Sequence, residues 1–178
     1  MKSLDLGCGP RSKKEGSIGL DKRPAPHVDV VHDLNSYPYP FRDNEFDCIE
    51  MSHIIEHVEK PLLLLNEVHR ITKHGGTVHI ITPHYSAQNS YGDFEHLHHF
   101  GYITFRTLQT TGLFRISKLK LQFPRVYRMI GVGVFANLLP QKWERYLSFV
   151  LPAVHVEVFL EVIKPRGEPD LLMKKYMY

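Results

Sequence analysis

The sequence predicts an α/β fold with a mainly parallel sheet, in one domain of 178 residues. Three observations predict it. Short apolar runs bounded by glycine, proline or asparagine recur through the first half of the chain. An amphipathic helical segment follows at residues 60–74, and two alternating segments close the second half. Strands that alternate with helices are typical of parallel sheets, so we expect helices between the strands.

Five strands are expected before residue 84, because each run has an apolar centre and ends at a turn-forming or acidic residue. They are residues 2–6, 17–21, 28–31, 46–51 and 77–82.

The clearest helix is expected at residues 60–74. Pro61 suits its first position, and Glu59 favours the positive N-terminal end. Gly75-Gly76 is expected to end it with a left-handed cap. Apolar residues follow helical spacing along one face. They are Leu62, Leu65, Val68 and Ile71, with Thr72 as the alternative to the last.

Beyond Pro83 the pattern changes to a loop rich in histidine and aromatic residues at 84–101. A short helix is expected at 104–112, with Thr104 as its cap. Residues 116–123 and 154–163 alternate apolar with polar residues, so we expect them to pair as an antiparallel hairpin. Between them, the pattern of residues 125–151 predicts an apolar, basic, helical insert in which Pro140 interrupts the helix.

Composition excludes several classes of protein. Hydrophobic residues make up 43% and charged residues 23%, as in globular domains. Only Cys8 and Cys48 are present, which excludes a disulfide framework and favours the cytoplasm. No apolar run reaches the roughly 18 residues of a membrane span, and because the first strand is expected to begin at once, we expect no signal peptide. Residues 1–100 carry −4 net charges, and residues 101–178 carry +7.

The specific signal is Asp5-Leu6-Gly7-Cys8-Gly9 after the first strand, with Asp21 at the end of the second. Glycines let a backbone approach a ligand closely, and an acid in this place can accept hydrogen bonds from ribose hydroxyls. A dinucleotide fingerprint needs glycine at position 12, where this chain has Ser12. A nicotinamide or flavin dehydrogenase is therefore disfavoured.

The chain resembles the class I S-adenosylmethionine-dependent methyltransferases of the methyltransferase type 11 group, closely over residues 2–83 and in outline over 84–163. The ordered pieces that carry the resemblance are Leu4-Asp5-Leu6-Gly7-Cys8-Gly9-Pro10, Gly19-Leu20-Asp21, His32-Asp33-Leu34, Phe46-Asp47-Cys48-Ile49, Ser52-His53-Ile54-Ile55-Glu56-His57-Val58 and residues 65–76. The resemblance implies a Rossmann-like seven-stranded sheet, mostly parallel, with an antiparallel C-terminal hairpin strand and a shortened first helix.

The resemblance also implies roles for individual positions. Residues of the first loop would hold the methionine part of the cofactor, Asp21 the ribose, Asp33 and Leu34 the adenine, and residues 51–53 the sulfonium region. The alternative is that Asp33 caps a turn and Met51 belongs to the core. The expected cofactor-binding set is Asp5, Gly7, Cys8, Gly9, Asp21, Lys22, Asp33, Leu34, Met51, Ser52 and His53.

The chain departs from the family in two places. The segment from Gly9 to Ile18 is too short for a full helix, so we expect one turn or a loop there. Arg11, Lys13 or Lys14 would then supply positive charge near the cofactor carboxylate. The helix that often covers the cofactor before the first strand is also missing.

Twelve histidines are present, and His84, His96, His98 and His99 follow the fifth strand. A histidine near the transfer site suits a general base, because its ordinary pKa lies near neutrality. No catalytic residue is assigned, and the candidates are His53, His57, His84 and His96. A metal site is the alternative use of this cluster. We expect none, because the spacing fits no familiar zinc pattern.

From Arg115 to Arg145 the chain holds seven Lys or Arg residues and one acid, Glu144. One interpretation is a cap that packs its apolar residues into the domain's own core. The other is an amphipathic surface, including Trp143, for an anionic membrane or a lipid-linked substrate. No RNA-binding motif appears, so nucleic acid is not expected. The oligomeric state stays open.

We therefore expect a single methyltransferase domain at 1–178, with 84–151 as substrate-side loops and helical cap. The expected function is methyl transfer from S-adenosylmethionine to a small or lipid-linked acceptor in the cytoplasm. The alternative is a catalytically inactive domain of the same fold that binds the cofactor or a partner.

Overall fold

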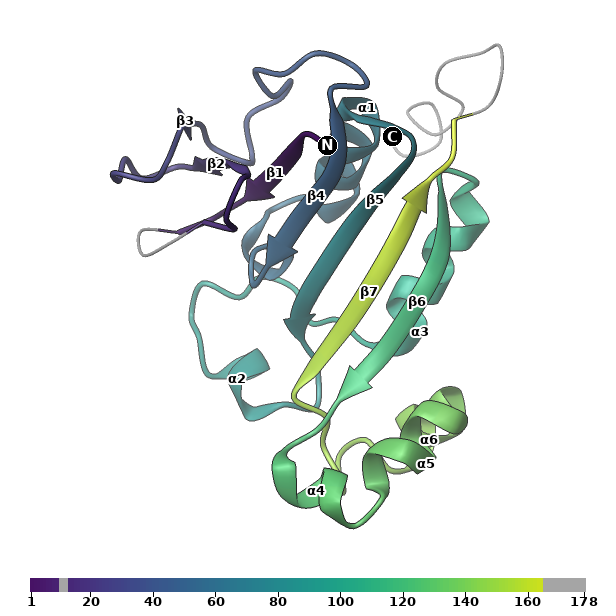
Figure 1. Cartoon of the computed structure of the whole chain (residues 1–178). Coiled ribbons are helices and arrows are strands. Elements are labelled where there is room, and N and C mark those ends of the chain that lie inside the picture. The colour runs from purple at the N-terminus through teal and green to yellow at the C-terminus, as the bar shows by residue number, and fades with distance from the viewer. Residues whose placement is uncertain (10–12, 165–178) are drawn as a thin grey trace.

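The computed structural model describes residues 1–9 and 13–164, which form a seven-stranded sheet in the order β3-β2-β1-β4-β5-β7-β6 (Figure 1). The strands are β1 (Ser3–Leu6), β2 (Ile18–Asp21), β3 (Val30–Val31), β4 (Phe46–Ser52), β5 (Thr72–Pro83), β6 (Phe114–Gln122) and β7 (His155–Val162). The first five pair in parallel, and β7 pairs antiparallel with both β5 and β6. The expected sheet and its C-terminal hairpin are confirmed.

The connections among β1, β2, β3 and β4 contain no helix in the described residues, so the expectation of helices between these strands is wrong. Residues 13–17 form a turn, as expected for so short a crossover, and Arg11 and Ser12 lie outside the described residues. The only described helices between parallel strands are η1 (Ile55–His57) and α1 (Pro61–Ile71), both between β4 and β5.

Helix α1 packs its apolar side chains against the back of the sheet, and it begins at Pro61 as expected. It ends at Ile71, three residues before the predicted end, because Thr72 is extended and pairs with Phe46 of β4. The β-branched Thr72 favours an extended backbone, and its hydroxyl donates to the Val68 carbonyl oxygen at 2.6 Å. Gly75-Gly76 therefore lies inside β5, and its predicted role as the cap is wrong.

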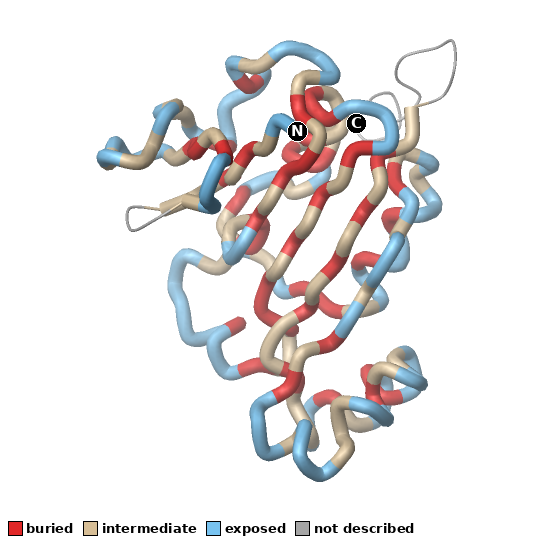
Figure 2. The backbone as a smooth tube through the Cα atoms, viewed as in Figure 1, coloured by how far each residue is buried: buried red, intermediate tan, exposed pale blue. Residues whose placement is uncertain are grey.

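The front face of β4, β5 and β7 is crossed by no helix among the described residues (Figures 1 and 2). Parallel sheets are usually covered on both faces, but this one alternates buried with half-exposed side chains. A polar row crosses the open face. His79 binds Glu50 at 2.6 Å and Glu157 at 3.1 Å, and Lys14 also pairs with Glu50. The side chains of this row therefore satisfy one another's hydrogen bonds and charges on a face that no described helix covers.

The second half adds α2 (Gln88–Tyr91), α3 (Tyr102–Arg106), η2 (Thr107–Thr111), α4 (Arg125–Met129), α5 (Val132–Leu138) and α6 (Pro140–Tyr146). The helical insert between β6 and β7 is confirmed, and Pro140 separates α5 from α6 as expected. No helix in the described part of the chain is long and apolar enough to span a membrane.

The buried Glu144 joins this insert to the sheet. Its carboxylate accepts hydrogen bonds from the backbone N–H groups of Tyr102 (2.6 Å) and Ile103 (2.9 Å), and contacts the His84 Nε2 atom at 3.1 Å. Helix α3 therefore begins two residues before the predicted start. The prediction of Thr104 as its N-cap is wrong, because a carboxylate from a distant helix supplies the cap.

We predict that His79→Gln removes a pH-dependent part of the stability. Hydrogen bonds to Glu50 raise the pKa of His79 above its ordinary value of 6.5. Stabilisation by the charged ring is therefore complete below pH 6.5 and is lost as pH rises through the raised pKa.

Thermal melting across this range is the measurement. The melting temperature of the wild type should exceed that of His79→Gln most at low pH. The difference should shrink as pH rises, by about 2–4 °C per kcal/mol of stability lost. A difference in melting temperature between the two proteins that stays constant with pH would show that His79 is not the source of this pH dependence.

Candidate cofactor-binding site

The loop after β1 is fixed by backbone bonds to β2. The N–H groups of Gly7 and Cys8 donate to the Leu20 carbonyl oxygen at 2.8 and 3.2 Å. The Gly9 N–H donates to Oδ2 of Asp21 at 2.8 Å. The His27 ring donates from Nε2 to the Gly9 carbonyl oxygen at 2.8 Å. The loop therefore lies against the end of β2, where the resemblance places the ribose.

The two glycines of the loop have different reasons to lack a side chain. Both have positive φ, 74° at Gly7 and 70° at Gly9. A Cβ on Gly7 would lie 2.3 Å from Cγ1 of Ile54, so packing requires this glycine. A Cβ on Gly9 would meet no atom of the described residues within 4 Å, so among these residues it faces open space. Gly9 is therefore the position at which a ligand can approach the backbone.

Two carboxylates frame the loop. Asp5 accepts a hydrogen bond from the Lys14 N–H at 2.7 Å, and burial raises the pKa of its carboxyl group. Asp21 accepts one bond on each oxygen, from Gly9 and from the Arg23 N–H at 2.9 Å. Each carboxylate oxygen of Asp21 keeps capacity for a second donor. Lys22 beside it is exposed.

Cys8 lies in the loop as a thiol. Burial, together with the carboxylates of Asp5 and Asp21, raises the pKa of Cys8 to about 11. A thiol with this pKa is protonated near neutral pH, so Cys8 lines the loop and does not act as a nucleophile.

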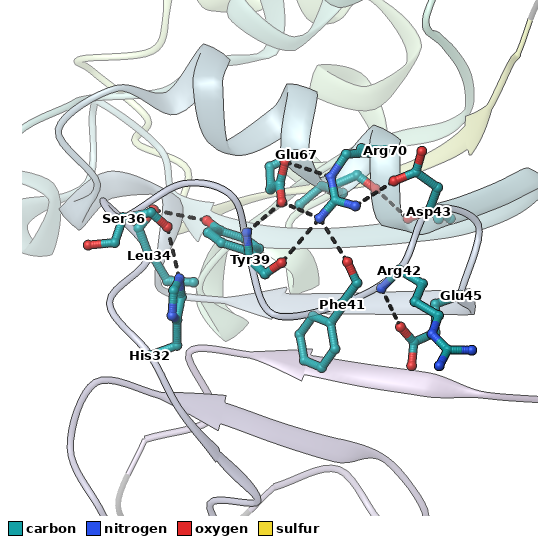
Figure 3. A network of polar contacts seen from close by, with 12 residues as sticks. His32, Leu34, Ser36, Tyr39, Phe41, Arg42, Asp43, Glu45, Glu67 and Arg70 are labelled. Carbon is teal, nitrogen blue, oxygen red and sulfur yellow. Dashed lines mark hydrogen bonds and ion pairs between the residues drawn. The ribbon is translucent and has the colours of Figure 1, made fainter.

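The segment after β3 is held by a partly buried ion-pair network (Figure 3). The Arg70 guanidinium binds both oxygens of Glu67, at 2.6 and 3.0 Å, and donates to the carbonyl oxygens of Tyr39 and Phe41. The Tyr39 hydroxyl then donates to the Leu34 carbonyl oxygen at 2.9 Å. Helix α1 thus fixes the loop expected beside the adenine.

Asp33 and Leu34 take different positions in this segment. An oxygen of Asp33 accepts from the Asn35 N–H at 3.0 Å, which is the turn-capping role weighed as the alternative. The Leu34 side chain is buried in the core. Only their backbone and the rest of the Asp33 carboxylate are open to a ligand.

The end of β4 carries an unusual backbone. Met51 is 1% exposed, so its side chain belongs to the core, as the alternative had it. Ser52 is exposed, and His53 has a φ of 54°. Positive φ at a non-glycine residue is uncommon and clusters at functional sites. The His53 ring lies against the ring of His155, with centroids 4.8 Å apart.

The four candidate catalytic histidines are not equivalent. His53 is half-exposed at the end of β4. His57 and His96 lie together, with ring centroids 4.6 Å apart. His84 is fully buried, and its ring contacts Glu144 and Trp143, so it supports the insert and does not face a substrate.

Sequence reasoning missed His27, Glu56, His155 and the Glu67–Arg70 pair. The sequence carries no signal for His27 or His155, because each meets the site through a tertiary contact. Glu56 belongs to the motif at residues 52–58, but the sequence does not show that its side chain is buried, with 1% exposed. The neighbouring His53 ring and a hydrogen bond from Thr82 hold the pKa of Glu56 below its ordinary value despite its burial.

The described residues fit S-adenosylmethionine. Asp21 has free acceptor capacity for ribose hydroxyls, Gly9 leaves open space at the backbone, and the backbone of the Asp33–Leu34 turn is fixed beside them. Lys13 and Lys14 lie near the loop, where Lys13 pairs with Asp29 and Lys14 with Glu50. Positive charge for the cofactor carboxylate is therefore close, although both amines are already engaged.

We predict that Arg70→Met destabilises the fold by at least about 3 kcal/mol, because it leaves the buried Glu67 carboxylate without its counter-ion. Denaturant unfolding measures the loss. Arg42→Met, an exposed arginine in the same loop, is the matched control and should change stability by less than about 0.5 kcal/mol. The double variant Glu67→Met/Arg70→Met should recover part of the loss; equal stability of Arg70→Met and wild type would contradict the role of the network.

Comparisons with known proteins agree with this geometry. Residues 14–80 match the family described as a methyltransferase domain. No curated protein matches the chain. An S-adenosylmethionine-dependent methyltransferase from Archaeoglobus fulgidus has the same fold, with a TM-score of 0.64 and 19% identity over 90% of this chain and 85% of that one.

Two further structures share the fold at lower identity. One is a chain of the complex between the Haloferax volcanii Trm112 methyltransferase activator and a putative methyltransferase, with a TM-score of 0.60, 16% identity and coverage of 92% and 83%. The other is the [4+2]-cyclase SpnF, with a TM-score of 0.59, 14% identity and coverage of 92% and 76%. The matched methyltransferase domain and the shared fold support the interpretation of the chain as a class I S-adenosylmethionine-dependent methyltransferase, with S-adenosylmethionine as its expected cofactor.

Proposed function

We propose that this protein transfers a methyl group from S-adenosylmethionine to an anionic small-molecule or lipid-linked acceptor that enters beside His53. The observation that supports it most is a basic groove between β6 and the helical insert. The groove has a volume of about 940 Å³. Among the described residues that line it, four are cations and none is an acid. They are Lys118, Lys120, Arg125 and Arg128.

The groove leads toward the proposed transfer site. Its lining includes His155, and the ring of His155 packs against His53 at the end of β4. Ligands of open α/β sheets bind at the carboxyl ends of the strands, where β4 and β5 end in this protein. An acceptor held by the four cations would therefore extend toward the residues expected around the sulfonium.

The chemistry asks little of the protein beyond position. The sulfonium of the cofactor supplies an activated methyl group, so no covalent enzyme intermediate is needed. Asp21 and the Gly9 loop would orient the cofactor, and the groove would orient the acceptor and exclude water. For an oxygen acceptor, we propose His53 as the general base. Burial and the neighbouring His53 lower the pKa of His155, so the pair does not hold two positive charges at neutral pH.

The helical insert supports a lipid-linked acceptor. Many of its large apolar side chains are exposed, whereas Val132, Leu147 and Trp143 pack into the domain's own core as the alternative proposed. Those exposed are Val126, Met129, Ile130, Val134, Phe135, Leu138, Leu139, Phe149 and Val150. Trp143 is 0% exposed, so its expected place on a lipid-facing surface is wrong. Exposed Arg125, Arg128, Lys142 and Arg145 accompany the apolar side chains, a combination typical of contact with anionic headgroups.

A second candidate function is a domain of this fold that binds cofactor or a partner without transferring a methyl group. It is favoured by the shared fold of SpnF, described as a [4+2]-cyclase, and by a neighbour found in complex with an activator protein. Methylated product formed from labelled S-adenosylmethionine and an anionic lipid-linked acceptor would exclude this alternative.

For location, we propose the cytoplasm. Cys8 and Cys48 are both free thiols, which is typical of a reducing compartment.

We predict that Asp21→Ala weakens S-adenosylmethionine binding at least tenfold, because hydrogen bonds to a charged acceptor are worth about 1.5–3 kcal/mol each. Titration calorimetry on the full chain measures it. Asp21→Asn keeps one acceptor oxygen and should lose less, and Glu15→Gln, an exposed acid near the same loop, should bind normally. An unchanged dissociation constant in folded Asp21→Ala would remove the ribose assignment.

We predict that the full chain co-sediments with anionic vesicles and not with neutral ones, and that salt weakens this binding. Each Lys or Arg near an anionic surface contributes about 1 kcal/mol, so Arg125→Glu/Arg128→Glu should reduce binding at least about tenfold. Arg106→Glu, on the exposed side of α3, is the control and should bind nearly as wild type. Equal binding to both lipids at high and low salt would contradict membrane contact and favour the interpretation of the insert as a structural cap.

A further inference from the structure

Three chemistry-bearing side chains meet beside the end of β4. Glu56 and His57 belong to η1, and His96 belongs to the loop after α2. One potential ligand atom from each lies within 4.8 Å of the other two. The two segments are joined by backbone bonds, since the Leu97 and His98 N–H groups donate to the Glu56 carbonyl oxygen at 2.8 and 3.2 Å. The cluster is therefore a product of the fold and is held on both sides.

Both imidazole rings are oriented by backbone carbonyl groups. The Nδ1 atom of His57 lies 3.0 Å from the Glu95 carbonyl oxygen, and Nδ1 of His96 lies 3.0 Å from that of Ser90. A carbonyl oxygen only accepts, so Nδ1 must carry the proton in each ring. The lone pair of a neutral ring is then on Nε2. Histidines that bind metals show this arrangement, in which the second nitrogen donates to a carbonyl or carboxylate.

One oxygen of the cluster's carboxylate lacks a hydrogen bond within the described residues. Glu56 is 1% exposed, and its Oε2 atom accepts from the Thr82 hydroxyl at 3.0 Å. Its Oε1 atom has no hydrogen bond from any described residue, and Nδ1 of His53 lies 3.5 Å away as an ion-pair neighbour. A buried carboxylate oxygen without a partner is unfavourable, and a bound cation would satisfy it.

We propose that Glu56, His57 and His96 bind one divalent transition-metal ion, Zn²⁺ or a similar ion, with an open coordination position. Two imidazoles and one carboxylate are the ligand set of many such sites, whereas Mg²⁺ and Ca²⁺ prefer oxygen alone. Bonds of about 2.0–2.2 Å place tetrahedral ligand atoms roughly 3.4 Å apart, so the cluster needs only a small side-chain movement to close. Asp93, exposed, has an oxygen 3.9 Å from Nε2 of His96.

This proposal departs from the expectation of no metal, which rested on spacing along the chain. His96 is remote from His57 in sequence, and only the folding of the loop onto η1 unites them. The site lies where β4 and β5 end, since Thr82 of β5 holds Glu56. It does not depend on methyl transfer, because the metal alone is the ligand tested.

The test is titration of metal-stripped full-length protein with Zn²⁺ by calorimetry, and with Co²⁺ by visible absorption. We expect one ion per chain and Co²⁺ ligand-field bands that Zn²⁺ abolishes. Substituting a residue that hydrogen-bonds to a metal ligand typically lowers metal affinity 10–100-fold, and substituting the ligand itself should lower it more. His96→Ala should therefore weaken Zn²⁺ binding by at least about 100-fold. Glu56→Gln, similar in shape and able to keep the Thr82 bond, should weaken it by at least about tenfold.

The matched control is His98→Ala, in the same loop, whose ring binds the Glu59 carbonyl oxygen and lies outside the cluster. It should bind Zn²⁺ as wild type does, and melting curves without metal verify that each variant folds. The proposal is overturned if wild type shows no stoichiometric binding, or if His98→Ala loses as much affinity as His96→Ala. Competition by equimolar Mg²⁺ would overturn it too. The wild-type Co²⁺ spectrum keeps the test decisive even if His96→Ala does not fold.

Discussion

The parallel pairing of β1 between β2 and β4 is the constraint on which the rest of the structure depends. It aligns Leu4 with Ile18 on one side and with Ile49 on the other, so three strands end at one edge of the sheet. The glycine loop, Asp21 and His53 all lie at that edge because they follow those strands. Backbone bonds from the loop to Leu20 then fix the loop without the long helix that commonly follows a first strand.

Three buried glutamates attach later segments to these strands. Their hydrogen bonding distinguishes the two that stabilise the fold from the one that is available to a ligand. Glu67 is matched by Arg70, and Glu144 by two backbone N–H groups and His84. These two hold the loop after β3 and the helical insert. Glu56 is equally buried, but one of its oxygens has no hydrogen bond. A fully satisfied carboxylate stabilises a fold, whereas an unsatisfied one beside two oriented histidines points to a ligand.

The open sheet face and the helical insert present two different kinds of surface. With no helix between β1, β2, β3 and β4 in the described residues, one face must be polar enough to meet water, and the Glu50–His79–Glu157 row provides this. The insert instead exposes apolar residues next to basic ones.

The sequence by itself determined the class of fold, the order of the motifs and the position of the glycine loop and Asp21. These depend on local patterns: alternation, turn residues, and glycines at strand ends. It also placed the insert and its break at Pro140. It did not determine where α1 ends, because Thr72 gains a strand partner in Phe46, nor what caps α3, because the cap comes from Glu144.

The same division holds in the site. Sequence spacing could select His53 and Asp21, which follow strands directly. It could not separate buried His84 from exposed His53, remove Trp143 from the surface, or bring His96 to Glu56 and His57. Those outcomes depend on contacts between residues far apart in the chain. Burial and hydrogen-bond partners are properties of the packed molecule, so only the tertiary structure decided them.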